Sequence, residues 1–194
     1  MAKPATGGES PHVRERDYLT PAEANRVVEA AGRAGRNGLR DQVLLRLIYR
    51  HGLRASEARQ VKWTQLDLAA PRDKTVHIFR VKSGNDSVHI LDRDEVAGLR
   101  KLWAAATGPF VFVSERGGIL SADMIARIVA RAAQRAAIGF HVHPHMLRHA
   151  AGHMLANAGT DTRLIQDFLG HRDIRNTVRY TRLAPGRLRA VRVR

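Results

Sequence analysis

The chain has 194 residues, of which 44% are hydrophobic, and this suits one folded domain rather than a disordered chain. Its 33 basic and 18 acidic residues give a formal net charge of +15, which favours a polyanionic partner, nucleic acid before an anionic membrane surface. The sequence has no cysteine, no apolar signal segment at its start and no run of about 18 apolar residues, which excludes disulfides and cysteine-based zinc sites and predicts a cytoplasmic protein without a transmembrane helix.

The first quarter of the chain predicts an arm followed by helices. Residues 1–17 are rich in glycine, proline and charge, so we expect a flexible arm. Thr20 and Glu23 have the spacing of a capping box, with proline at the first helical position between them, so a helix begins there. Apolar residues then recur at helical spacing up to Gly52, and a further short helix is predicted near Ala55.

Strands are predicted in the middle of the chain. The apolar residues Val76 and Ile78, then Val88 and Ile90, alternate with polar ones on either side of a turn at residues 83–86, which predicts a β-hairpin. A short apolar strand candidate follows at residues 110–113.

The second half of the chain is predicted to be mainly helical. Asp92 and Ser121 each have the position of a helix cap, and further helices follow over residues 146–155 and residues 161–169. We therefore expect an α+β fold, mainly α with a small antiparallel β-sheet, over residues 18–182. Residues 183–194 are expected to be a basic C-terminal tail.

Some side chains have the chemistry needed to bind and activate a phosphodiester without a metal. The guanidinium groups of Arg54 and Arg148 could neutralise the charge that spreads over the non-bridging oxygens in the transition state, because arginine keeps its protons. The imidazoles of His145 and His171 could donate a hydrogen bond or accept a proton near neutral pH.

The nucleophile and the acid that such a reaction needs also have candidates. Tyr180 could form a covalent bond that conserves the phosphodiester energy if nearby cations stabilise its phenolate, since the phenol has an ordinary pKa of about 10. Lys82, at the edge of the predicted hairpin turn, could protonate the departing sugar oxygen.

Three boxes that carry these residues resemble those of the tyrosine recombinases, also called phage integrases. They read HGLRASE around Arg54, HPHMLRHAAGHMLANAG around His145 and Arg148, and LGHRDIRNTVRYT, in which His171 precedes Tyr180 by nine residues. Their joint order and spacing are highly specific, and the resemblance spans nearly all of the expected ordered chain. The sequence is most similar to the short recombinases that invert the fimbrial promoter switch in enteric bacteria.

The resemblance implies a site-specific recombinase with the catalytic-domain fold of that family. By it Tyr180 attacks a DNA phosphate, leaving a 3′-phosphotyrosyl link and a free 5′-hydroxyl, while the other candidate residues assist. No metal, ATP or other cofactor is implied. The implied partners are double-stranded DNA at inverted-repeat sites, a homotetramer on DNA and accessory DNA-bending proteins, and the implied location is the bacterial cytoplasm, at the nucleoid.

Other interpretations of the same residues stay open. Arg54 could simply pair with Glu57 across a helix turn, and Lys82 could be an ordinary solvated lysine. Arginines at four-residue spacing could form either a DNA-facing surface or a solvated helix face. They are Arg127, Arg131 and Arg135.

The remaining histidines and the overall activity also leave alternatives. His141, His143 and His145 alternate, so on a strand they would share a face as zinc ligands, although no carboxylate or further histidine follows at metalloenzyme spacing. His149 and His153 are interpreted as helix-packing or DNA-backbone residues. The alternative functions are a non-catalytic DNA-binding regulator on the same scaffold and a nicking enzyme similar to type IB topoisomerases.

Overall fold

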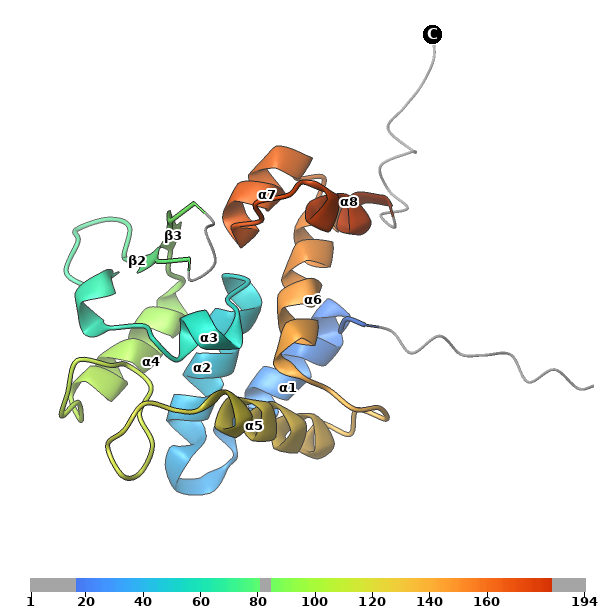
Figure 1. The fold of residues 1–194 in the computed structure, drawn as a ribbon. Coiled ribbons are helices and arrows are strands. Elements are labelled where there is room, and N and C mark those ends of the chain that lie inside the picture. Colours follow the sequence, from blue (N-terminus) through green and yellow to red (C-terminus); the bar gives the residue numbers. More distant parts are fainter. Residues whose placement is uncertain (1–16, 81–84, 183–194) are drawn as a thin grey trace, which may run out of the picture.

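The fold combines helices with a small antiparallel sheet, which confirms the predicted class (Figure 1). The structure is a computed structural model that describes residues 17–80 and 85–182. Its α-helices are α1 (Pro21–Gly32), α2 (Gly38–Arg50), α3 (Ala55–Ala58), α4 (Arg93–Trp103), α5 (Ala122–Arg135), α6 (Pro144–Asn157), α7 (Thr162–Leu169) and α8 (Arg175–Arg182). The strands are β1 (Leu66–Asp67), β2 (Thr75–Ile78) and β3 (Ser87–Ile90), and short 3-10 helices span Gly35–Asn37 and Trp63–Gln65.

The helices begin where the sequence predicts caps. At the start of α1 the Glu23 carboxylate accepts a hydrogen bond from the Thr20 backbone at 2.8 Å, and the Thr20 hydroxyl accepts one from the Glu23 backbone at 3.3 Å. Glu95 accepts in the same way from the backbone of Asp92 at the start of α4, and the Ser121 hydroxyl caps α5. These bonds satisfy backbone N–H groups that a helix leaves without an internal partner.

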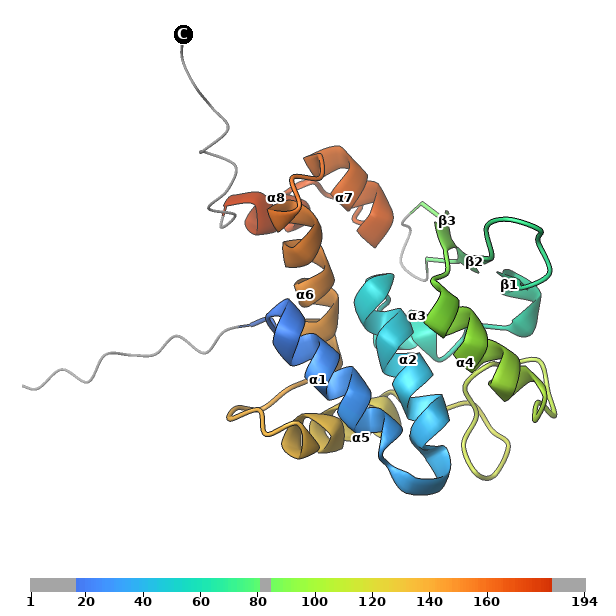
Figure 2. The same ribbon diagram turned by 180° about the vertical axis from the view of Figure 1, so that it is seen from behind.

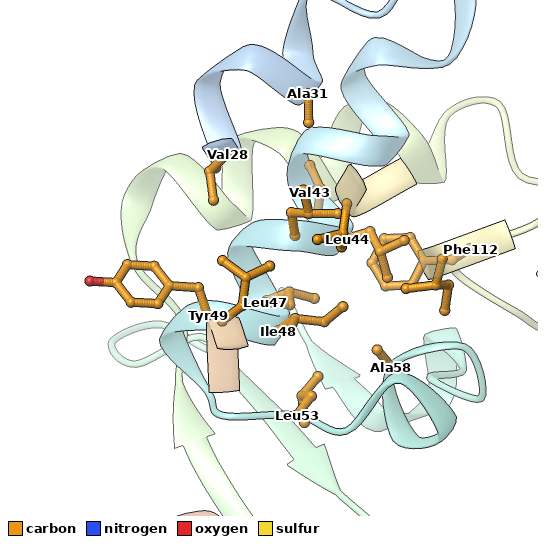
Figure 3. Close-up of a cluster of buried hydrophobic side chains, with 14 of the residues drawn as sticks. Val28, Ala31, Val43, Leu44, Leu47, Ile48, Tyr49, Leu53, Ala58 and Phe112 are labelled. Atoms are coloured by element: carbon orange, nitrogen blue, oxygen red, sulfur yellow. The ribbon is translucent and has the colours of Figure 1, made fainter. Parts of the chain in front are cut away.

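Helix α2 is the centre of the core. Its apolar residues are buried on almost all sides, and it packs against α1, α4 and α6 (Figure 3). Leu44, Leu47 and Ile48 are fully buried and lie close to Val28 of α1 and to Phe112. Seen from behind, α1 lies beside α2, and α5 crosses at the end of α1 (Figure 2). Eight of its 13 residues are buried, so most of the helix faces other parts of the chain. Its C-terminal end leads directly into the segment of Arg54.

The predicted hairpin is confirmed for the part of it that the structure describes. Strands β2 and β3 are antiparallel, with Val76 opposite His89 and Ile78 opposite Ser87. Strand β1 adds an edge that the sequence did not predict. Lys82 and the start of the predicted turn lie outside the described residues, as do most of the predicted arm and the basic tail.

The predicted strand at residues 110–113 is wrong. Phe110 makes only an isolated bridge with Lys62, and Val113 makes another with Ile119, so no ladder forms among the described residues. The segment is apolar because it fills the core: Phe112 is fully buried. A buried irregular segment and a short strand have the same apolar pattern, which explains the error.

The C-terminal helices α7 and α8 lie at one end of α6, and α7 lies beside the hairpin (Figure 1). Phe168 of α7 packs against His89 of β3, with ring centroids 4.2 Å apart. The helix begins at the predicted cap Asp161 and ends at Gly170, whose φ of 61° is left-handed and favours glycine. A Cβ on Gly170 would also lie 2.5 Å from Nε of Arg80, so the hairpin and α7 approach too closely there for a side chain. Among the described residues no helix is both long enough and apolar enough to cross a membrane.

Candidate active site

A buried carboxylate lies at the centre of the candidate site. Glu57, in the short helix α3, is 4% exposed. Its Oε1 accepts a hydrogen bond from Nη1 of Arg54 at 2.6 Å, and its Oε2 accepts one from Nη1 of Arg80 at 2.9 Å. Nη1 of Arg148 lies 3.8 Å from the same Oε2. One negative charge therefore holds three guanidinium groups, and the group as a whole keeps an excess of positive charge.

Arg148 is held by the protein backbone on its other side. It is 3% exposed and donates hydrogen bonds to the carbonyl of Gly52, and to that of Leu169 at 2.6 Å. Burial, followed by repulsion from Arg54, lowers the pKa of Arg148 to about 10. The guanidinium therefore remains charged at neutral pH, in an orientation fixed from both sides.

Arg80 is a member of this group that the sequence did not indicate. It lies just after β2 and is buried, and it donates a hydrogen bond to the carbonyl of Phe168 as well as to Glu57. Burial lowers its pKa, against the opposing effect of Glu57. Its backbone N–H donates to Oδ1 of Asp86 at 2.9 Å, which links the two strands' extensions at the turn end of the hairpin.

Arg54 is the accessible member of the group, with 22% of its side chain exposed. The alternative interpretation, a pair with Glu57, is confirmed by the hydrogen bond between them. Among the described residues that bond is the only one its guanidinium makes, so its other N–H donors remain free for a ligand.

Tyr180 of α8 is buried against a group of histidines, with only 1% of its surface exposed. Its hydroxyl lies 2.8 Å from Nδ1 of His149, and its ring stacks on that of His171 at 6.2 Å between centroids. His153 packs edge-on against the same ring at 5.0 Å. Gly152 makes this possible, because a Cβ there would lie 2.8 Å from the tyrosine ring.

The charges around Tyr180 act in opposite directions. Burial raises the pKa of its phenol, whereas Arg179 and Arg148 lower it. The phenol is therefore protonated in the DNA-free protein. When it loses its proton, the nearby guanidinium groups stabilise the negative charge on its oxygen.

The two predicted histidines are neutral at physiological pH. Burial, followed by the charge of Arg148, lowers the pKa of His171 to about 3, and the same two causes lower the pKa of His145. Nδ1 of His171 lies 2.9 Å from the hydroxyl of Thr177, which leaves its Nε2 for another partner. His145 is only partly buried and keeps more exposed surface than His171, and its ring stacks on that of His149 with 6.2 Å between centroids.

The predicted arginine stripe lies apart from this group. It lies on the exposed side of α5 and lines a cavity of about 490 Å³ together with Arg40 and Asp41. Burial raises the pKa of Asp41, against the opposing effect of Arg40 and of two members of the stripe. The stripe consists of Arg127, Arg131 and Arg135.

The zinc interpretation required His141, His143 and His145 to lie on one strand, and that requirement is wrong. His143 caps α6, which begins at Pro144, so the three histidines do not share a strand. Among the described residues one group of possible metal ligands lies close together, and Arg50 pairs with each of its members. That group is Asp92, Asp94 and Glu95.

His153 packs within the protein, as predicted, but His149 has a closer relation to Tyr180 than the sequence suggested. His149 follows Arg148 in the second box and lies four residues after His145, so it shares a side of α6 with His145. The four-residue spacing from His145 was the sequence signal that could have placed His149 in the site. Its contact with Tyr180 was not predictable, because α8 lies far from α6 along the chain.

Comparisons with known proteins identify the family of the chain. Residues 17–187 match the phage integrase family. The type 1 fimbriae regulatory protein FimE of Escherichia coli (strain K12) is 43% identical over 174 residues, which is 86% of each chain. Tyrosine recombinase XerC of Xylella fastidiosa (strain M23) is 39% identical over 151 residues, or 75% of this chain, which spans 49% of that protein.

A solved structure shows the same fold. The crystal structure of XerA recombinase is 27% identical and superimposes with a TM-score of 0.75, covering 89% of this chain and 62% of the XerA chain. The boxes, the fold and the relatives coincide over the same residues. The chain therefore belongs to the phage integrase family and is a site-specific DNA recombinase, a tyrosine recombinase.

Proposed function

We propose that this recombinase cuts a DNA strand by transesterification, with Tyr180 as the nucleophile. The observation that carries the proposal is the position of Tyr180 between the histidines of α6 and His171, close enough to Arg148 and Arg54 for both to lower the pKa of its phenol. A phenol beside fixed guanidiniums suits attack on a phosphate, because those charges stabilise the phenolate oxygen and the phosphate oxygens alike.

The scissile phosphate binds to Arg54 and Arg148 in this proposal. Glu57 neutralises part of the charge of the arginine group, and the excess attracts the phosphate. Arg54 offers its free N–H donors from the exposed side. His145 and His171, neutral before DNA binds, each offer one N–H donor to a non-bridging oxygen.

The reaction conserves the energy of the phosphodiester. The phenol oxygen of Tyr180 bonds to phosphorus as the bond to the 5′-oxygen breaks, which gives a 3′-phosphotyrosyl link and a free 5′-hydroxyl. A 5′-hydroxyl of a partner strand then attacks that link and releases the tyrosine. Because one ester replaces another at each step, neither ATP nor a metal ion is required.

Lys82 is proposed as the acid that protonates the departing 5′-oxygen, and this rests on the family resemblance. Lys82 itself lies outside the described residues. The described residue Arg80, two positions earlier, pairs with Glu57, so the hairpin is anchored directly to the arginine group. A positioned acid contributes about a hundredfold to ten-thousandfold to such a reaction.

The wider assembly is also a proposal. Strand exchange joins two duplexes, which favours a homotetramer on double-stranded DNA at inverted-repeat sites, with accessory DNA-bending proteins. We assign catalysis to residues 18–182, and additional phosphate contacts to the basic residues of the arm and tail. The protein acts in this proposal at the bacterial nucleoid.

Tyr180→Phe should abolish the covalent protein–DNA adduct while DNA binding persists, because the ring remains and only the nucleophilic oxygen is lost. The measurement is a denaturing gel after incubation with a nicked suicide duplex, made from inverted repeats that flank the gene. Tyr49→Phe is the matched control, since Tyr49 is also buried but its hydroxyl contacts Met154. An adduct that persists in Tyr180→Phe would exclude Tyr180 as the nucleophile.

Replacing the α5 arginine stripe with alanine should weaken DNA binding and flatten its salt dependence. Each lost phosphate contact reduces the slope of log K against log salt by about 0.9, so the triple variant should lose up to about 3 units of slope. A triple variant with the same change of charge elsewhere is the control, and its slope should fall less. It carries Arg72→Ala, Arg93→Ala and Lys101→Ala, all at exposed positions. Equal slopes for the two variants would show that the stripe is merely solvated.

Lys82→Ala should be slow on ordinary DNA and close to normal on a strand with a 5′-bridging sulfur, because a thiolate leaves without a proton. Arg54→Ala should be slow on both substrates, since its role is to neutralise charge. Lys74→Ala is the control: it removes the same charge immediately before β2, away from the turn, and should be fast on both substrates. The rate of adduct formation is the readout, and equal defects of Lys82→Ala on the two strands would remove it from the acid role.

A further inference from the structure

His149 is in direct contact with the atom that the proposed function makes the nucleophile. The Tyr180 hydroxyl lies 2.8 Å from Nδ1 of His149, and within the described part of the chain that oxygen makes no other hydrogen bond. A buried hydroxyl needs an acceptor for its proton, and Nδ1 of a neutral imidazole is one. We therefore assign His149 the tautomer that carries its proton on Nε2, in which Nδ1 accepts the hydrogen bond that the phenol donates.

Among the described residues, no other histidine forms a hydrogen bond with the hydroxyl. Nδ1 of His171 is occupied by Thr177, and its ring lies nearly parallel to the tyrosine ring at an interplanar angle of 17°. His153 meets the ring edge-on at 86° and serves as packing. His145 reaches the tyrosine only through His149, on which it stacks.

We propose that His149 accepts the proton of Tyr180 during attack on the DNA phosphate. The inference rests on the proposed function of Tyr180 and adds to it a group in contact with the reacting oxygen.

The proton remains on the phenol until DNA is bound. Burial, followed by the charge of Arg179, lowers the pKa of His149 to about 4, although the nearby Asp17 raises it, and burial raises the pKa of Tyr180. Free phenolate is therefore scarce in the DNA-free protein. As the oxygen bonds to phosphorus its affinity for the proton falls far below that of imidazole, so the transfer accompanies bond formation. The phosphate anion also raises the pKa of His149 when it binds.

The step balances in both directions. The electrons of the O–H bond remain on the phenol oxygen, which attacks phosphorus, and the proton moves to Nδ1 of His149. The bond from phosphorus to the 5′-oxygen breaks with its electron pair on that oxygen, which takes a proton from the proposed acid. On rejoining, the incoming 5′-hydroxyl gives its proton to the proposed acid, which cleavage left deprotonated, and its oxygen displaces the tyrosine oxygen from phosphorus. The imidazolium of His149 returns its proton to the tyrosine oxygen.

His149→Asn separates proton acceptance from hydrogen bonding. An asparagine amide oxygen takes up approximately the place of Nδ1, so it keeps the bond to the hydroxyl but does not accept the proton at neutral pH. We expect adduct formation on the nicked duplex to slow about a hundredfold to ten-thousandfold, with DNA affinity unchanged. His153→Asn is the matched control, because it changes a histidine on the same helix that packs against the ring without contacting the oxygen.

A more acidic phenol distinguishes a proton acceptor from a residue that only positions the ring. With 3,5-difluorotyrosine at position 180, more of the phenol is ionised at a given pH, so the attack depends less on a proton acceptor. The fluorinated residue should restore much of the rate of His149→Asn, and should not restore any rate that His153→Asn loses. Circular dichroism and DNA affinity establish that each variant is folded.

The outcomes separate the two proposals. Adduct formation by His149→Asn at the wild-type rate would overturn the role of His149, and so would a slow rate that the fluorinated residue leaves unchanged. If instead the wild-type protein forms no adduct, or Tyr180→Phe still forms one, then the proposed function of Tyr180 fails first.

Discussion

The arrangement of the site depends on one buried carboxylate. Guanidinium groups as close as those of Arg54, Arg80 and Arg148 repel one another, and burying them without a counter-charge is costly. Glu57 makes the arrangement possible by pairing directly with Arg54 and Arg80 and lying near Arg148. Because it neutralises only part of their charge, the remainder is available for an anion. The same interaction therefore serves the fold and the proposed phosphate site.

The end of α7 completes this arrangement from the other side. The carbonyls of Phe168 and Leu169 accept hydrogen bonds from Arg80 and Arg148, at the end of the helix where the dipole favours positive charge. Gly170 then turns the chain toward His171, and only a glycine suits both its left-handed φ and the close approach of Arg80. The hairpin, α6 and α7 thus meet at the arginines, and His171 and Tyr180 follow in the chain from that junction.

Much of the fold follows from local rules, whereas the site depends on contacts between distant residues. The caps at Thr20 and Ser121 were predictable because their partners lie three residues away. The boxes identified the candidate residues, but nothing near Arg80 indicates that it bonds to a carbonyl 88 positions away. The contact between His149 and Tyr180, 31 positions apart, arises only when α8 packs on α6. The strand predicted at residues 110–113 failed for the related reason that burial alone does not determine backbone pairing.

A double-mutant cycle tests the role of the carboxylate most directly. The free energy of unfolding in urea would be measured for Glu57→Gln, Arg80→Met and the double variant. Glu57→Gln leaves the buried Arg80 without its counter-charge and should cost about 3–5 kcal/mol. Arg80→Met leaves Glu57 its pair with Arg54 and should cost less, whereas the double change removes both charges of the Glu57–Arg80 pair. We predict that the double variant is more stable than the sum of the single effects implies, by at least about 1 kcal/mol. Effects that add to within about 0.5 kcal/mol would contradict the claim that Glu57 holds the arginine group together.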